Sequence, residues 1–193
     1  MLKPQDIVIL LKILSTMTLS KGYPKESLSQ NRLATFLCIS VSEVNAGIKR
    51  LTNARLLELV LKDEKIILLP NKQACEECLI SGVKYFFAVH IGEPTRGVAT
   101  SYAAPMFNEL ISIGNDPIPV WPYIEGDHRG NALEPLYPSV PKSIILYPDP
   151  LFYELLVLID AIRSGKARER NIAVELLKKR LNYDQKTIFR KSS

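Results

Sequence analysis

Residues 29–53 read Ser-Gln-Asn-Arg-Leu-Ala-Thr-Phe-Leu-Cys-Ile-Ser-Val-Ser-Glu-Val-Asn-Ala-Gly-Ile-Lys-Arg-Leu-Thr-Asn, and this stretch contains the clearest structural signals of the sequence. Ser29 is a preferred N-cap for a short helix. Three residues after that helix, Ser40 and Glu43 form the S-x-x-E pattern of a capping box, in which each side chain bonds the other residue's backbone N–H. This predicts a second helix that ends near Asn53. Two short helices joined by so tight a turn are typical of a helix-turn-helix.

The second helix has two chemically different faces. Val44, Ile48 and Leu51 recur at i, i+4 and i+7 and form the inward face. The opposite face has small and polar side chains that suit a DNA major groove, where Asn pairs with adenine and Lys or Arg reaches guanine or phosphate. A solvated surface helix has the same composition and is the alternative. The candidate DNA-binding residues in and just after this helix are Ser42, Asn45, Ala46, Lys49, Arg50, Asn53 and Arg55.

Helical and strand patterns flank this pair of helices. Pro4 suits the first turn of a helix that runs to about Ser20, with apolar residues recurring on one face. After the pair, the alternating residues 57–61 and the apolar residues 66–69 predict a hairpin. A hairpin directly after the third helix would be the wing of a winged-helix domain.

The tip of this hairpin contains two further candidate DNA contacts. Lys62 and Lys65 are suited to phosphate binding, but Asp63 and Glu64 lie between them and cancel their charge. We therefore expect the hairpin to position the protein on DNA rather than to anchor it electrostatically.

The first 70 residues resemble winged helix-turn-helix transcriptional regulators of the MarR type. The segments that carry the resemblance are Lys3-Pro4-Gln5-Asp6, Ser29-Gln30-Asn31-Arg32-Leu33-Ala34, Ile39-Ser40-Val41-Ser42-Glu43-Val44-Asn45, and Ile48-Lys49-Arg50-Leu51 up to Leu56-Leu57. The resemblance implies DNA binding, with 41–53 as the recognition helix. Such regulators commonly have glycine at the turn position that Cys38 occupies here. If that position needs a positive φ, cysteine costs about 1–2 kcal/mol.

Charge and proline divide the chain of 193 residues into three zones. The formal net charge of +5 is distributed as +3 over residues 1–80, −3 over 81–150 and +5 over 151–193, and ten of the 13 prolines lie between positions 94 and 150. Such proline density excludes long helices and central strands from the middle zone.

Two short segments of the middle zone, 93–99 and 126–132, are similar in sequence, because each places an Arg-Gly pair beside acidic residues. Arg96 and Arg129 would line a pocket for a small anionic effector, with Trp121 and Tyr123 as apolar walls. The alternative is that these arginines form salt bridges that hold the proline-rich loops in place.

Other chemistry finds less support in the sequence. Cys75 and Cys78 form a C-x-x-C within a predicted helix over 71–81, but no second pair completes a zinc site. Residues 83–90 have strand composition. Asp127-His128 is the one adjacent acid/base pair, without a nucleophile motif or a phosphate-binding glycine loop. We expect no metal, no cofactor and no enzymatic activity.

The C-terminal zone predicts a helical hairpin. Asp149-Pro150 is a cap followed by a first-turn proline, and the helix that begins there ends at Ser164-Gly165; a second helix covers about 167–181. Self-association is a candidate role, because helix-turn-helix proteins commonly bind two half-sites as two-fold dimers. Segments 136–141 and 151–156 are similar to those of uncharacterised prokaryotic regulators, which supports a two-part layout.

Composition bounds the location of the protein. The longest apolar runs, Ile7–Leu11 and Leu155–Ile159, are five residues each, far below the roughly 20 needed to span a bilayer. An acidic residue precedes the first run, unlike in a signal peptide. Three cysteines, an odd number, indicate a reducing compartment. We therefore expect a cytoplasmic protein with no membrane span.

Together these patterns predict an α+β protein with a winged helix-turn-helix domain at 1–70. A proline-rich sheet-and-helix domain at 71–193 would serve effector binding, dimerisation or partner binding. The expected function is sequence-specific transcription regulation, with double-stranded DNA as partner and the protein as a homodimer. The alternative is a protein-interaction module, antitoxin-like or an assembly factor, whose winged helix docks a protein.

Overall fold

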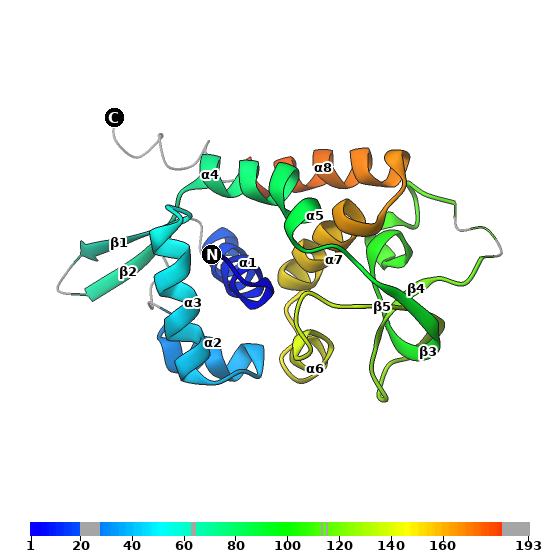
Figure 1. The fold of residues 1–193 in the computed structure, drawn as a ribbon, viewed down its shortest axis with the longest axis horizontal. Coiled ribbons are helices and arrows are strands. Elements are labelled where there is room, and N and C mark those ends of the chain that lie inside the picture. The colour runs from blue at the N-terminus through cyan, green and yellow to red at the C-terminus, as the bar shows by residue number, and fades with distance from the viewer. Residues whose placement is uncertain (20–27, 63–64, 113, 115, 183–193) are drawn as a thin grey trace.

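The chain folds into a mixed α+β structure with two small sheets (Figure 1). The computed structural model describes residues 1–19, 28–62, 65–112, 114 and 116–182. Among these residues, none of the helices is long and apolar enough to cross a membrane. The helices are α1 (Pro4–Leu19), α2 (Gln30–Leu37), α3 (Val41–Asn53), α4 (Lys72–Glu77), α5 (Val83–Phe86), α6 (Val140–Leu146), α7 (Pro150–Ser164) and α8 (Ala167–Asn182). The strands are β1 (Leu57–Lys62), β2 (Lys65–Pro70), β3 (Ile91–Ala99), β4 (Pro119–Pro122) and β5 (His128–Leu133).

Two helices, α1 and α7, form the centre of the molecule. Every residue of Ile7–Leu11 in α1 is at most 1% exposed, and every residue of Leu155–Ile159 in α7 is at most 2% exposed. In Figure 1, α1 lies between α3 on one side and α7 on the other. The expected single apolar face of the first helix is therefore wrong, because α1 is buried on all sides in this region.

The hydrophobic core continues past residue 70, the expected domain boundary. One cluster of buried side chains includes α1, α2, α3, α7 and the middle segment around Trp121. A buried ion pair also joins the two halves: Lys12 Nζ lies 2.7 Å from Asp149 Oδ2, and its ammonium lies over the rings of Phe36 and Phe152. The N-terminal helices and the C-terminal part thus pack as one unit around α1.

The middle zone closes into a small three-stranded barrel. β3 pairs antiparallel with both β4 and β5, and β4 runs parallel to β5, so the expected exclusion of central strands from this zone is wrong. Pro94 of β3 lies where the β3–β5 register is irregular. Gly97 and Gly130, the glycines of the two Arg-Gly pairs, make this closure possible. A Cβ atom built on Gly97 would lie 1.9 Å from the carbonyl oxygen of Trp121, and one on Gly130 would lie 1.9 Å from that of Ile118. Both positions therefore need glycine for the backbones to approach so closely.

The expected strand over 83–90 is wrong. The chain continues from α4 through a π-helical turn, Cys78–Gly82, into α5. Val83 is buried there, whereas Tyr85 and Phe86 are 75% and 77% exposed. The aromatic residues favour a strand by local propensity, but the continuing helix and the burial of Val83 determine the conformation. The predicted C-terminal helical hairpin is present as α7 and α8, which pack against each other.

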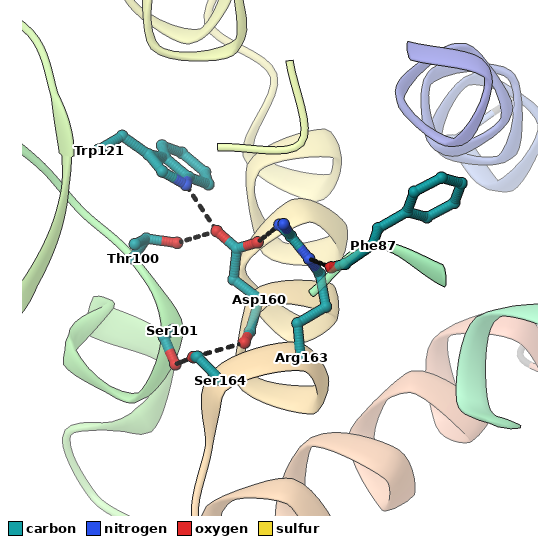
Figure 2. A network of polar contacts seen from close by, with 7 residues as sticks. All are labelled: Phe87, Thr100, Ser101, Trp121, Asp160, Arg163 and Ser164. Atoms are coloured by element: carbon teal, nitrogen blue, oxygen red, sulfur yellow. Dashed lines mark hydrogen bonds and ion pairs between the residues drawn. The ribbon is translucent and has the colours of Figure 1, made fainter. Parts of the chain in front are cut away.

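A buried polar network fixes the barrel to α7 (Figure 2). Asp160 is 1% exposed, and its Oδ2 accepts hydrogen bonds from Trp121 Nε1 at 2.6 Å and Thr100 Oγ1 at 2.9 Å. Its Oδ1 accepts from Arg163 at 2.7 Å, and Arg163 Nε donates to the carbonyl of Phe87 at 2.7 Å. Burial raises the pKa of Asp160, and Arg163, Trp121 and Thr100 oppose that shift by favouring the carboxylate.

A second set of bonds extends this network at the end of β3. Ser164 Oγ lies 3.0 Å from Ser101 Oγ and donates to the carbonyl of Asp160 at 2.7 Å. Ser101 has a φ of 52°, in the left-handed region that non-glycine residues rarely adopt. The contact with Ser164 connects this turn to α7.

The network generates a stability prediction. Replacing Asp160 with Asn leaves the Arg163 guanidinium, 3% exposed, without a counter-charge. We expect Asp160→Asn to lower the free energy of unfolding by about 3–5 kcal/mol. Urea denaturation followed by Trp121 fluorescence measures this loss. A loss below about 1 kcal/mol would show that the ion pair does not stabilise the barrel on α7.

Candidate nucleic-acid interface

The start of α3 is fixed by the predicted capping box. Glu43 N donates to Ser40 Oγ at 3.1 Å, and Ser40 N donates to Glu43 Oε2 at 3.1 Å. The hydroxyl of Tyr137, from the segment before α6, also donates to Glu43 Oε1. The hydrogen bonds from Tyr137 and then Ser40 lower the pKa of Glu43, so this side chain is a carboxylate at neutral pH.

The turn between α2 and α3 has the backbone conformation that normally favours glycine. Cys38 has φ 53° and ψ 41°, and the N–H groups of Cys38 and Ile39 bond the carbonyls of Thr35 and Ala34 at the end of α2. We expect cysteine to cost about 1–2 kcal/mol if this position has a positive φ. The φ of Cys38 is positive, so that condition is met. The segment before α6 supports the turn, because Ser139 Oγ donates to the carbonyl of Leu37 at 2.7 Å.

The outward face of α3 is accessible and polar. Ser42, Lys49 and Asn53 are exposed, and Ala46 and Asn45 are half-buried beside them. Asn45 Nδ2 donates to the side chain of Gln30 at the start of α2 at 3.0 Å, which orients its amide. Lys49 makes no hydrogen bond or ion pair with any residue that the structure describes. The helix therefore presents small side chains, an amide and a cation to solvent.

Arg50, also a candidate DNA contact, points back into the protein. Its Nε and Nη2 donate to the two carboxylate oxygens of Asp6 at 2.7 and 2.6 Å, and the side chain of Asp6 is 0% exposed. The hydrogen bonds to Asp6 raise the pKa of Arg50. This bidentate pair fixes the rotation of α3 on α1. In this structure Arg50 is a structural residue of the α1–α3 contact, which sequence spacing did not indicate.

The remaining candidate contacts lie beyond α3. Arg55 is exposed and has a φ of 59°, which ends the helix and turns the chain into β1. Lys62 and Lys65 belong to the ends of β1 and β2, which pair as the predicted hairpin, but their side chains lie outside the described residues.

The hairpin has an apolar surface that its sequence pattern alone did not reveal. Leu59, Leu61 and Ile66 are 54%, 73% and 64% exposed. Leu61 pairs with Ile66 and Leu59 with Leu68, so these side chains share one face of the hairpin. In Figure 1 the hairpin extends away from the helices. Its described part therefore offers hydrophobic contacts as well as polar ones.

The residues expected to line an effector pocket separate into two groups. Trp121 is 1% exposed and belongs to the core, where it bonds Asp160 and packs edge-to-face on Tyr153, so it does not line a surface pocket here. Arg96 and Arg129 are exposed on β3 and β5, and Tyr123 is half-buried in the turn after β4.

The remaining candidates for metal binding or catalysis are the cysteines and the Asp127-His128 pair. Cys75 Sγ donates to the carbonyl of Leu56, and burial raises its pKa to about 12, which keeps the thiol protonated. Over the described ranges, no group of three or more His, Cys, Asp or Glu side chains is placed to hold a metal ion. His128 Nδ1 lies 2.6 Å from Asp127 Oδ1 in an exposed pair.

Comparisons identify no relative of this chain: no family model, no curated protein and no solved structure matches it.

The conformation of Cys38 predicts a stabilising substitution. Glycine adopts positive φ without the Cβ penalty, so we expect Cys38→Gly to raise the free energy of unfolding by about 0.5–1 kcal/mol after the entropy cost of glycine. As a control, Ala46→Gly in the right-handed helix α3 should lower it by about 1 kcal/mol. Chemical denaturation measures both, and equal destabilisation by the two glycines would contradict the role of φ.

The contrast between Lys49 and Arg50 predicts different stability effects for neighbouring cations. Arg50→Ala leaves the buried Asp6 carboxylate without its partner, so we expect a loss of about 3 kcal/mol in unfolding free energy. Lys49→Ala should change it by less than about 0.5 kcal/mol, because the side chain is exposed and unpaired. Similar losses for both variants in urea denaturation would contradict this assignment.

Proposed function

We propose that this protein is a sequence-specific DNA-binding transcriptional regulator. In this proposal α1, α2 and α3 with the β1–β2 hairpin act as a winged helix-turn-helix of the MarR type, and α3 is the recognition helix. The observation that carries the proposal is the outward face of α3, where Ser42, Ala46 and the unpaired Lys49 surround the amide of Asn45.

The geometry of α3 supports this use. Small residues on an exposed helix face let its backbone approach base edges, and an oriented amide can pair with adenine. The Asp6–Arg50 pair and the buried opposite face hold the helix at one rotation, so the same side chains always point outward. We propose that two copies bind two half-sites, as is usual for this class of DNA-binding motif.

Replacing Lys49 tests the DNA-binding role. Duplexes selected from a random pool provide the specific ligand, and random duplexes provide the reference. We expect Lys49→Ala to weaken specific binding by about 1–3 kcal/mol if Lys49 reads a base. If Lys49 touches a phosphate, both ligands should lose affinity alike and the salt slope should fall by about one.

The matched control is Lys166→Ala, which removes an exposed lysine beyond α7, away from the helix-turn-helix. It should leave duplex affinity within twofold of the wild type. No duplex binding by the wild type at low salt, or equal losses in both lysine variants, would contradict the proposal.

A protein-docking role for the hairpin is a second proposal, favoured by its exposed Leu59, Leu61 and Ile66. Exposed leucine and isoleucine suit a protein partner better than a phosphate backbone. Leu61→Thr distinguishes the two roles, because it should weaken a stoichiometric protein complex and leave duplex affinity unchanged.

A further inference from the structure

Two arginines lie opposite each other on neighbouring strands of the barrel. In the β3–β5 pair Arg96 lies directly opposite Arg129, and both side chains are exposed. Side chains of directly opposite residues in an antiparallel pair project from the same face, with Cβ atoms about 5 Å apart. Like charges in this arrangement destabilise a sheet. The two similar Arg-Gly segments of the sequence thus lie side by side in the barrel, with their two cationic residues opposite each other.

The backbone around these arginines is closely fixed. Arg96 Nε donates to the carbonyl of Gly126 at 2.6 Å, and Tyr123 N donates to the carbonyl of Arg96 at 3.0 Å. Gly97 and Gly130, which follow the two arginines, pack against the backbone of the β4 segment with no room for a Cβ. The strands therefore hold the backbones of the two arginines opposite each other, and the bond to Gly126 ties the Arg96 side chain to the turn before β5.

No acidic side chain in the described part of the chain forms an ion pair with Arg129. Asp127 is the closest in sequence, and its carboxylate lies 2.6 Å from His128 Nδ1. The hydrogen bond from His128, with a smaller contribution from Arg96, lowers the pKa of Asp127. Glu93 and Glu125 are exposed and make no ion pair within the described part of the chain. Within the same part, Arg129 makes neither a hydrogen bond nor an ion pair.

We propose that Arg96 and Arg129 together bind the phosphoryl group of a small phosphorylated ligand. Each guanidinium presents parallel N–H groups that form bidentate bonds to an oxyanion. A tetrahedral phosphate has enough oxygens to accept from both guanidinium groups, whereas one guanidinium occupies both oxygens of a carboxylate. Binding also removes the repulsion between the two cations.

The site is separate from the proposed DNA-binding surface. Figure 1 shows the barrel at the opposite end of the molecule from the β1–β2 hairpin, with α1 and α7 between them. The phosphate proposal can therefore be tested separately from the DNA-binding proposal. A free small ligand fits the position better than the duplex that α3 would hold.

Thermal unfolding and calorimetry of the full chain with inorganic pyrophosphate test the proposal. We expect pyrophosphate to raise Tm above the value in sodium chloride of equal ionic strength, and Arg129→Gln to weaken its affinity at least tenfold. Arg168→Gln, which removes an exposed arginine of α8, should keep wild-type affinity. No Tm difference between pyrophosphate and chloride, or equal losses in both variants, would overturn it.

Two further measurements distinguish phosphate binding from a structural role of Arg129 and from binding of single-stranded nucleic acid. Without added anion, Arg129→Gln should be at least as stable as the wild type because it removes the repulsion; a clear loss of Tm would assign Arg129 a structural role and overturn the proposal. A short single-stranded oligonucleotide without terminal phosphates should bind no better to the wild type than to Arg129→Gln. Arginine-dependent binding of that oligonucleotide without pyrophosphate binding would also overturn the proposal.

Discussion

Residues 6–15 of α1 are buried on every side of the helix, and this burial determines how the neighbouring helices pack on it. A helix enclosed this way must pair the charges it contains, and Asp6 and Lys12 do so in opposite directions. Asp6 bonds Arg50 of α3, and Lys12 bonds Asp149 at the start of α7. One helix thus fixes both the proposed recognition helix and the C-terminal helical hairpin. Because breaking a buried pair costs several kcal/mol, these two contacts specify the arrangement of the halves.

The same constraint determines which side of α3 meets solvent. Gly47 lies where a Cβ would come within 2.5 Å of Ile9 Cδ1, so α3 packs closely on α1. With Arg50 bonded to Asp6 on one flank and Asn45 to Gln30 on the other, Lys49 is left outward. The barrel depends on α7 in a parallel way, through the buried Asp160 and its three donors.

Several local signals in the sequence predicted the local structure correctly, although the strand composition of residues 83–90 did not. The capping box, the tight turn at Cys38, the hairpin and the Asp149 cap are all present, because each depends on residues a few positions apart. The partners of Asp6 and Asp160 could not be predicted, because they are distant in sequence. Arg50 lies 44 positions from Asp6, and Trp121 and Thr100 lie 39 and 60 positions from Asp160. The two apolar runs, Ile7–Leu11 and Leu155–Ile159, are a sequence signal for helices that are buried on all sides, as α1 and α7 are there.

An NMR footprint of a selected DNA duplex on the full chain tests whether the outward face of α3 binds DNA. If α1 holds α3 with its polar face outward for DNA, the amide signals of Ser42, Ala46, Lys49 and Asn53 should shift on binding. Those of the barrel strands should stay in place. Shifts confined to the barrel or to the apolar face of the hairpin, with α3 unchanged, would contradict the account.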